Sequence, residues 1–312
     1  VQNGLQKDWQ NYTPPVPQLI GKKVLKNYPL ATLVEYFDWT PFFISWSLAG
    51  KFPKILQDDV VGEAARDLYE QAQAMLKDII ENQRFDARAV FAIYPAKRTA
   101  ADTVTTYDEQ GQKTHDFYHL RQQSDKVTGK PNLSLADFIS PNDGDYLGGF
   151  TVSIFGVEEM ADQFKAQGDD YSAILAQSLG DRFAEAFAEH LHERIRKEFW
   201  GYQANEQLSN DDLIREKYVG IRPAPGYPAC PEHTEKGTLF EWLQSEQEIG
   251  TQLTTSYAMY PPSSVSGFYY SLAESEYFNV GKISQDQLED YAQRKGWDLA
   301  TAKKWLNPNL GD

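Results

Sequence analysis

One loop of the chain concentrates residue types that could bind a small charged molecule. Segment 222–231 reads RPAPGYPACP, and its four prolines exclude a regular helix or a central strand. Proline fixes φ, while Gly226 permits a positive φ or a close approach, so such a loop can hold a ligand at little ordering cost. Arg222 offers a planar fork suited to a carboxylate, and Tyr227 offers a flat face with a hydroxyl tip. The alternative is a loop that only wraps a core.

The histidines do not form a predicted metal site. On a helix, His190 and His192 would point to nearly opposite faces, so they cannot chelate one ion together. We expect both side chains to be solvated or partly packed. The remaining histidines, His115, His119 and His233, lack a suitably spaced carboxylate or cysteine partner.

No common catalytic motif is present. The adjacent carboxylates at 158–159 and 169–170 diverge in direction and are expected to be solvated. The sequence contains no Gly-x-Gly-x-x-Gly after a strand, no phosphate-binding Gly-x-x-x-x-Gly-Lys-Ser/Thr and no Gly-x-Ser-x-Gly elbow. We therefore assign no catalytic residue.

The elements that must position the loop alternate between helix and strand. Apolar spacing predicts helices over 60–82, 170–200 and 239–249, and a capping pattern at Ser284 predicts another helix ending near Gly296. Strands are expected at 89–94, ending at Pro95, at 146–155, and as a hairpin of 103–107 with 113–118. Segments 256–260, 265–272 and 277–280 look extended. This mixture predicts an α+β fold.

Composition limits the class of protein. The 312 residues, 41% hydrophobic and 24% charged, support a folded core of one or two domains. A net charge of −15 disfavours nucleic acid and anionic membrane surfaces as partners. No apolar run approaches the ~20 residues of a membrane span, and no secretory signal is visible. The single cysteine, Cys230, fits a reducing, cytoplasmic compartment, and the absence of an initiator Met suggests a fragment.

Segment 222–231 closely resembles the Arg-x-x-x-Gly-Tyr region of the S-adenosylmethionine-binding activation domain of cobalamin-dependent methionine synthase. The resemblance extends over essentially the whole chain, through DWTPFF at 38–43, DYLGGF at 145–150, AEAFAE at 184–189, WGY at 200–202, and 290–306. It implies that residues 1–312 form one C-shaped α+β domain with a twisted antiparallel β-sheet and flanking helices. It also implies that this domain is the C-terminal part of a larger multidomain enzyme.

The resemblance carries a function with it. In that family the domain binds S-adenosylmethionine and presents its methyl group for reductive remethylation of cobalamin, which reactivates a methyltransferase of methionine biosynthesis. Cobalamin is held by an upstream module of the same polypeptide, a flavodoxin-type protein donates the electron, and zinc is needed only in the full-length enzyme. The isolated domain is not expected to methylate homocysteine.

Six ligand-binding residues are implied by the resemblance: Asp38, Glu185, Arg222, Tyr227, Tyr277 and Phe278. Arg222 would bind the methionine carboxylate, and Asp38 the ammonium group or nearby polar atoms. Tyr277 and Phe278 resemble the adenosine-side contact, and Tyr227 belongs to the motif loop. Glu185 lies opposite the apolar stripe of the long predicted helix, so the alternative for this residue is an ordinary solvated position.

A second interpretation comes from a different class. A free-standing acidic ligand-binding or carbohydrate-handling protein could use the 13% aromatic content for stacking on sugars. A titration with S-adenosylmethionine against a panel of oligosaccharides distinguishes the two.

Overall fold

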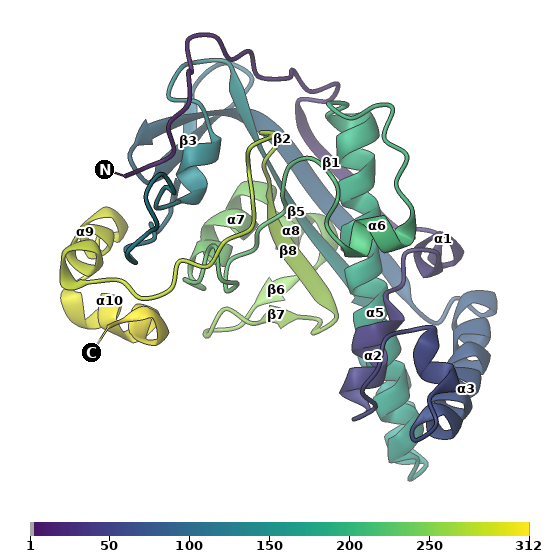
Figure 1. The fold of residues 1–312 in the computed structure, drawn as a ribbon. Helices are drawn as coiled ribbons and strands as arrows, with labels where there is room; N and C mark the ends of the chain where they lie inside the picture. Colours follow the sequence, from purple (N-terminus) through teal and green to yellow (C-terminus); the bar gives the residue numbers. More distant parts are fainter. Residues whose placement is uncertain (1–2, 312) are drawn as a thin grey trace.

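The centre of the fold is an antiparallel sheet of six strands. The structure is a computed structural model and describes residues 3–311. The strands run in the order β4-β3-β2-β5-β8, with β1 also paired to β2 (Figure 1). Their bounds are β1 Gly21–Leu25, β2 Asp86–Ala100, β3 Thr103–Tyr107, β4 Lys113–Tyr118, β5 Asp145–Phe155 and β8 Ser264–Tyr269. A separate two-stranded ribbon joins β6 Gln252–Leu253 to β7 Met259–Tyr260. The predicted antiparallel α+β arrangement is confirmed.

The helices flank this sheet, and Figure 1 shows the elements as an arc with α9 and α10 at one end and α2 and α3 at the other. Their bounds are α1 Leu30–Val34, α2 Trp39–Ser45, α3 Gly62–Glu81, α4 Val157–Ala166, α5 Asp170–Arg194, α6 Asn210–Ile214, α7 Glu235–Leu243, α8 Ser245–Ile249, α9 Gln285–Lys295 and α10 Leu299–Leu306. Helix α5 ends in a π-helical turn, Ile195–Phe199, so the predicted helix 170–200 is two pieces.

Strand β2 is longer than the sequence predicted, because Pro95 does not end it. β2 pairs with β5 from Asp86 to Ala96. On its other side β2 changes neighbours at this point, since β1 pairs only as far as Ile93 and β3 begins pairing at Ala96. Proline, which has no N–H to donate, therefore lies at the junction between two partners, where the ladder is already interrupted.

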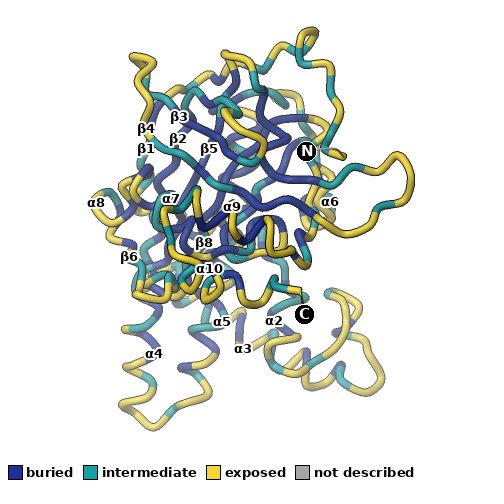
Figure 2. Tube along the Cα trace, turned by 90° about the vertical axis from the view of Figure 1, so that its left-hand side faces the viewer, coloured by how far each residue is buried: buried dark blue, intermediate teal, exposed yellow. Residues whose placement is uncertain are grey.

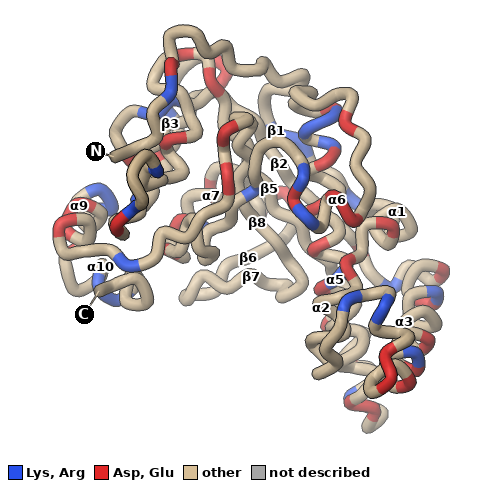
Figure 3. The backbone as a smooth tube through the Cα atoms, in the orientation of Figure 1, with Lys and Arg blue, Asp and Glu red and all other residues tan. Residues whose placement is uncertain are grey.

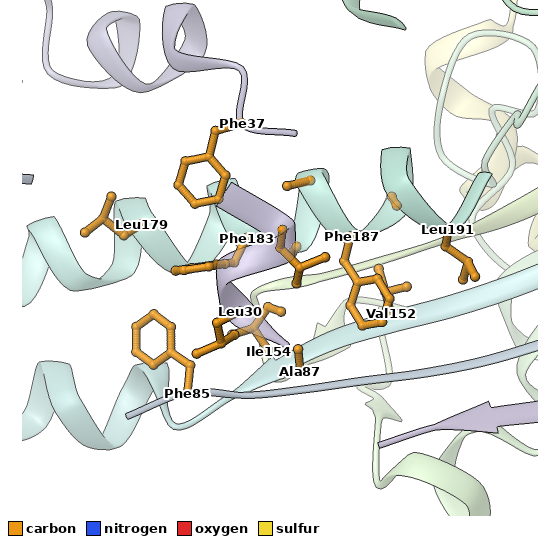
Figure 4. Close-up of a cluster of buried hydrophobic side chains, with 14 of the residues drawn as sticks. Leu30, Phe37, Phe85, Ala87, Val152, Ile154, Leu179, Phe183, Phe187 and Leu191 are labelled. Carbon is orange, nitrogen blue, oxygen red and sulfur yellow. The ribbon is translucent and has the colours of Figure 1, made fainter. Parts of the chain in front are cut away.

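The two faces of β2 and β5 belong to two different cores. Phe91 packs in the core that α5 covers, while its neighbour Val90 packs in the core on the α7 side, as the alternation of side chains along a strand requires. In Figure 4, Phe187 points from α5 toward Val152 of β5, and Phe183 lies between Phe37 and Phe85, with which its ring is in contact. The predicted apolar stripe of the long helix is thus confirmed. Burial is concentrated in these strands, and the outer ends of α3 and α4 are exposed (Figure 2).

Three local predictions were wrong. The helix expected over 239–249 is broken into α7 and α8 at Gln244, whose φ is +54°. Segment 277–280 forms no strand. The Ser284 side chain accepts no hydrogen bond from a backbone N–H of the first turn of α9, and its hydroxyl bonds to the side chains of Gln123 and Asp286 instead. The end of α9 at Gly296 agrees with the prediction.

The histidines are more buried than expected. His192 is fully buried and its ring stacks on Tyr269 of β8, with ring centroids 5.3 Å apart. His190 is 8% exposed and its Nε2 lies 2.6 Å from the Tyr28 hydroxyl. The expectation of solvated or partly packed rings is wrong, because α5 is covered both by the sheet and by the chain that leads into α1.

One buried histidine gives a testable pH dependence. Burial, with a smaller contribution from Arg294, lowers the pKa of His119 to about 3. The folded chain therefore keeps His119 neutral, whereas the unfolded chain protonates it below its ordinary pKa, so stability falls as pH decreases from 6.5 toward 3. At pH 5 this one group costs roughly 2 kcal/mol.

We expect His119→Gln, which retains a nitrogen near the Tyr270 hydroxyl 3.1 Å from His119 Nε2, to lose about 2 kcal/mol less stability than the wild type between pH 7 and pH 5. Urea denaturation at the two pH values measures the difference. Parallel pH dependences of variant and wild type would show that His119 does not titrate differently on unfolding.

The net charge of −15 is spread over the molecule. Acidic and basic positions are mixed along α3 and α9, and further acidic positions lie at α6 (Figure 3). Within residues 3–311, no helix is long and apolar enough to cross a bilayer.

Candidate functional site

A cavity of about 490 Å³, which we call the main cavity, opens beside segment 222–231. Five of the six predicted binding residues line it: Glu185, Arg222, Tyr227, Tyr277 and Phe278. These residues come from α5, from the proline-rich loop and from the segment before α9, which are far apart in the sequence. The fold therefore brings together most of the set that the resemblance implied.

Backbone hydrogen bonds fix the proline-rich loop in place. Within the loop, the Gly226 N–H donates to the Cys230 carbonyl at 2.7 Å. The loop also continues the sheet beyond β8, because the Phe268 N–H donates to the Pro223 carbonyl at 2.8 Å, while Ile221 and Tyr270 exchange two bonds of 3.0 Å. The loop is thus preorganised by its neighbours as well as by its prolines.

Gly226 is the one position of this loop that needs glycine. Its φ is +94°, and a Cβ there would lie 2.5 Å from Cε1 of His233. We expect Gly226→Ala to lower stability by more than the ~1–2 kcal/mol that the left-handed backbone alone costs an alanine.

Gly168 is the matched control for this prediction, since its φ is +76° and a Cβ would meet nothing within 4 Å. Thermal denaturation of Gly226→Ala and Gly168→Ala separates backbone strain from the steric clash. Equal losses in the two variants would show that His233 moves aside without cost.

Arg222 lines the main cavity, and three of its five guanidinium N–H groups already bond to other side chains. Nη1 and Nη2 donate to the two carboxylate oxygens of Glu189 at 2.9 and 3.0 Å, and Nη1 also lies 3.1 Å from Nδ1 of His192. Burial keeps the pKa of His192 well below its ordinary value, so this imidazole is neutral and accepts the bond. The Nε–H and the second Nη2–H have no partner among residues 3–311, which leaves one side of the fork for a carboxylate.

Two tyrosines support the same arginine. The Arg222 backbone N–H donates to the Tyr277 hydroxyl at 3.0 Å, and that hydroxyl lies 2.6 Å from the hydroxyl of Tyr218. Burial raises the pKa of both phenols, so both stay protonated at neutral pH. Tyr277 remains 37% exposed and forms one wall of the cavity with Phe278, and Tyr227 stands 61% exposed at the rim.

Asp38 lies outside the main cavity, in an adjoining hollow of about 300 Å³ that we call the side hollow. The main cavity and the side hollow share Glu185, Glu216 and Arg222, so they meet at the guanidinium. One oxygen of Asp38 accepts the Thr40 N–H at 3.2 Å and caps α2, and burial raises the pKa of its carboxyl group. Asp38 is therefore fixed near Arg222 but separate from the aromatic wall.

Sequence reasoning missed four residues of the site: Glu189, His192, Glu216 and Tyr218. Glu189 follows Glu185 by four residues, and this helical spacing was a usable signal that both face the same side of α5. Glu216 has a φ of +58° after the short helix α6, a conformation that nothing in the local sequence indicates.

The site offers binding groups, and residues 3–311 contain no cluster of three His, Cys, Asp or Glu side chains able to hold a metal ion. Burial raises the pKa of the Cys230 thiol well above its ordinary value, so it is not a ready nucleophile. A forked cation, nearby carboxylates and an aromatic wall around one cavity define an α+β binding domain for a small molecule that carries charge and a flat ring.

Comparisons with known proteins identify the family to which this binding domain belongs. The family model described as "Vitamin B12 dependent methionine synthase, activation domain" matches residues 29–296, and the chain belongs to that family. It is thus an activation domain of cobalamin-dependent methionine synthase, a methyltransferase.

A solved structure supports the assignment. The chain is similar to the crystal structure of the MetH reactivation domain bound to AdoHcy, at 48% identity, over 100% of this chain and 97% of that chain, with a TM-score of 0.96. The resemblance stated from the sequence and the single-domain α+β fold are both confirmed.

Proposed function

We propose that this chain binds S-adenosylmethionine in the main cavity and presents its methyl group for the reductive remethylation of cobalamin. The observation that carries the proposal is the partly unoccupied fork of Arg222, next to carboxylates and an aromatic wall. The similar MetH reactivation domain was solved with AdoHcy, the demethylated form of this ligand, which favours the same ligand class here.

The ligand's parts match the groups around the cavity. The methionine carboxylate pairs with Nε and Nη2 of Arg222, and the ammonium group lies toward Asp38 in the side hollow. The adenosine lies against Tyr277 and Phe278, and Tyr227 closes the rim. Glu185, which lines both spaces, is placed to attract the positive charges of the ligand.

This chain contributes positioning to the methyl transfer. When docked, the cobalamin of an upstream module would supply the nucleophile for the methyl group, and S-adenosylhomocysteine would remain as the product. The rigid loop and Arg222 hold the sulfonium in a fixed orientation, which lowers the ordering cost of that encounter.

The wider setting is part of the proposal. Residues 1–312 act as one domain of a longer cytoplasmic polypeptide of methionine biosynthesis, whose cobalamin-binding module docks across the main cavity. A flavodoxin-type protein donates the electron, and zinc serves the homocysteine site elsewhere in the full-length enzyme. The acidic surface of this chain makes nucleic acid an unfavourable partner.

Calorimetry tests the binding step. The purified chain is titrated with S-adenosylmethionine and S-adenosylhomocysteine in the presence of a chelator, with an oligosaccharide panel as the comparison. We expect saturable binding of both nucleosides without metal. Binding of a sugar, with none of either nucleoside at millimolar concentration, would favour the carbohydrate-handling alternative.

Product analysis tests the transfer step. The chain is incubated with S-adenosylmethionine, homocysteine and zinc, with and without a cobalamin-binding fragment and a reductant. We expect methylcobalamin only in the complete reduced mixture and no methionine from this chain alone. Methionine formed by the chain alone would overturn the assignment.

A further inference from the structure

A second cavity, of about 280 Å³, adjoins the proline-rich loop, and we call it the outer cavity. Its lining includes Gly226 and Tyr227 of the loop, His233 and Lys236 from the segment that begins α7, and Ser266 of β8. Tyr227 also lines the main cavity, whereas Arg222 and Tyr277 do not line the outer one. The two cavities are therefore neighbours with different chemistry.

Lys236 is a largely buried cation that forms no ion pair in the described part of the chain. The residue is only 7% exposed, and its ammonium group, which is not closed to solvent, makes no hydrogen bond with any of residues 3–311. The nearest charged influence on it is Glu232, whose carboxylate oxygens already accept bonds from the N–H and hydroxyl of Thr234 and from the hydroxyl of Tyr291. Burial lowers the pKa of Lys236, and the Glu232 carboxylate offsets part of that shift.

One further group at the cavity can bond to an anion. The His233 ring packs against Gly226, where no Cβ intervenes, and makes no hydrogen bond within residues 3–311. The residue is exposed, so a ring N–H can donate to an anion in the cavity. The hydroxyl of Ser266 is closed to solvent and is therefore not counted among the binding groups.

The charge of the side chains that line the outer cavity differs in sign from the net charge of the chain. The chain carries a net charge of −15, yet no Asp or Glu lines the outer cavity. Because no carboxylate lines the cavity, none competes there with an anion for the Lys236 ammonium group. The volume is below the ~300–1,000 Å³ of typical sites for drug-sized ligands, so the occupant is small.

We propose that the outer cavity is a binding site for a small oxoanion, a phosphate or a carboxylate group. Lys236 supplies the opposite charge, and His233 supplies a hydrogen bond. The site uses neither the guanidinium of Arg222 nor the wall formed by Tyr277 and Phe278, although Tyr227 and Val265 line both cavities.

Inorganic phosphate and acetate are the probes, each titrated into the purified chain by calorimetry against potassium chloride at constant ionic strength. We expect saturable binding of at least one probe with a Kd near or below about 1 mM. Phosphate binding assigns the site to phosphate groups, and binding of acetate alone assigns it to carboxylates.

Lys236→Met is the test variant, and Lys130→Met, at an exposed loop position, is the matched control. We expect Lys236→Met to weaken probe binding by about tenfold or more and Lys130→Met to leave it unchanged. Lys236 forms no hydrogen bond or ion pair within residues 3–311, so Lys236→Met is expected to fold about as stably as the wild type in probe-free buffer.

A second readout does not depend on that variant. The ring signals of His233, assigned in NMR spectra with His233→Gln, are expected to shift with the same saturation curve as the heat of binding. No saturable binding up to about 50 mM, or equal binding by Lys236→Met and wild type, would overturn the proposal.

Discussion

Replacing Arg222 by methionine is expected to weaken S-adenosylmethionine binding by about 10- to 100-fold, measured by calorimetry. A charge-assisted, bidentate contact to a carboxylate is worth ~1.5–3 kcal/mol, and each ~1.4 kcal/mol corresponds to a tenfold change in Kd. Methionine keeps the unbranched stem of the side chain and removes all five donors. A folded Arg222→Met variant with wild-type affinity would place the carboxylate elsewhere.

Because Arg222 forms an ion pair with Glu189, the Arg222→Met experiment requires two controls. Removing Arg222 also strands the Glu189 carboxylate, which is 12% exposed and would repel the ligand's own carboxylate. The double variant Glu189→Gln/Arg222→Met removes this repulsion and is expected to bind nearly as weakly as the single variant. A ligand analogue without the carboxylate is expected to bind wild type and Arg222→Met with similar affinity, and a large difference between them would contradict a carboxylate contact.

The largest stability effect is expected at Lys295, at the end of α9. Its ammonium group lies 2.7 Å from an oxygen of Glu235 and 3.6 Å from one of Glu232, and the side chains of these three residues are at most 10% exposed. Lys295→Met would leave two buried carboxylates without their cation. Breaking one side of a buried ion pair costs ~3–5 kcal/mol, so we expect a loss of this size at pH 8 in urea denaturation.

The pH dependence identifies the mechanism of that loss. Burial raises the pKa of Glu235 even in the presence of Lys295, so without the lysine this carboxyl group takes up a proton more readily. Neutralising it removes the unpaired charge, and the variant's deficit is therefore expected to shrink between pH 8 and pH 5. Lys303→Met, on the neighbouring helix α10, is the surface control. A deficit that is small at pH 8, or unchanged at pH 5, would show that water already solvates these carboxylates.

The sequence predicted the elements whose pattern is local and repeated. The hairpin of β3 and β4 follows from two β-rich runs around a Gly-containing turn, and both strands have the predicted bounds. Strand β5 begins one residue before the predicted run at Tyr146, and the stripe of α5 that includes Phe183 and Phe187 packs in the core. In these segments one hydrophobic face was enough to specify the element.

Other features depend on contacts that no local pattern records. The short helices α1 and α2 are only 5 and 7 residues long, and packing against α5 stabilises them rather than propensity. The pairing of Glu189 with Arg222 joins residues 33 positions apart. For the same reason, the partial occupation of the guanidinium fork could not be predicted, although Arg222 itself was.

The loop that lines the main cavity also covers an edge of the sheet. β8 ends the strand order. The Phe268 N–H donates to the Pro223 carbonyl, and Ile221 and Tyr270 exchange two hydrogen bonds, so backbone groups that an uncovered strand would present to other chains are satisfied. Uncovered edges of this kind promote strand pairing between molecules and hence aggregation. The segment from Ile221 to Pro223 therefore has two roles, since it covers this edge and carries Arg222 at the main cavity. Substitutions that loosen it are expected to promote self-association as well as to weaken ligand binding.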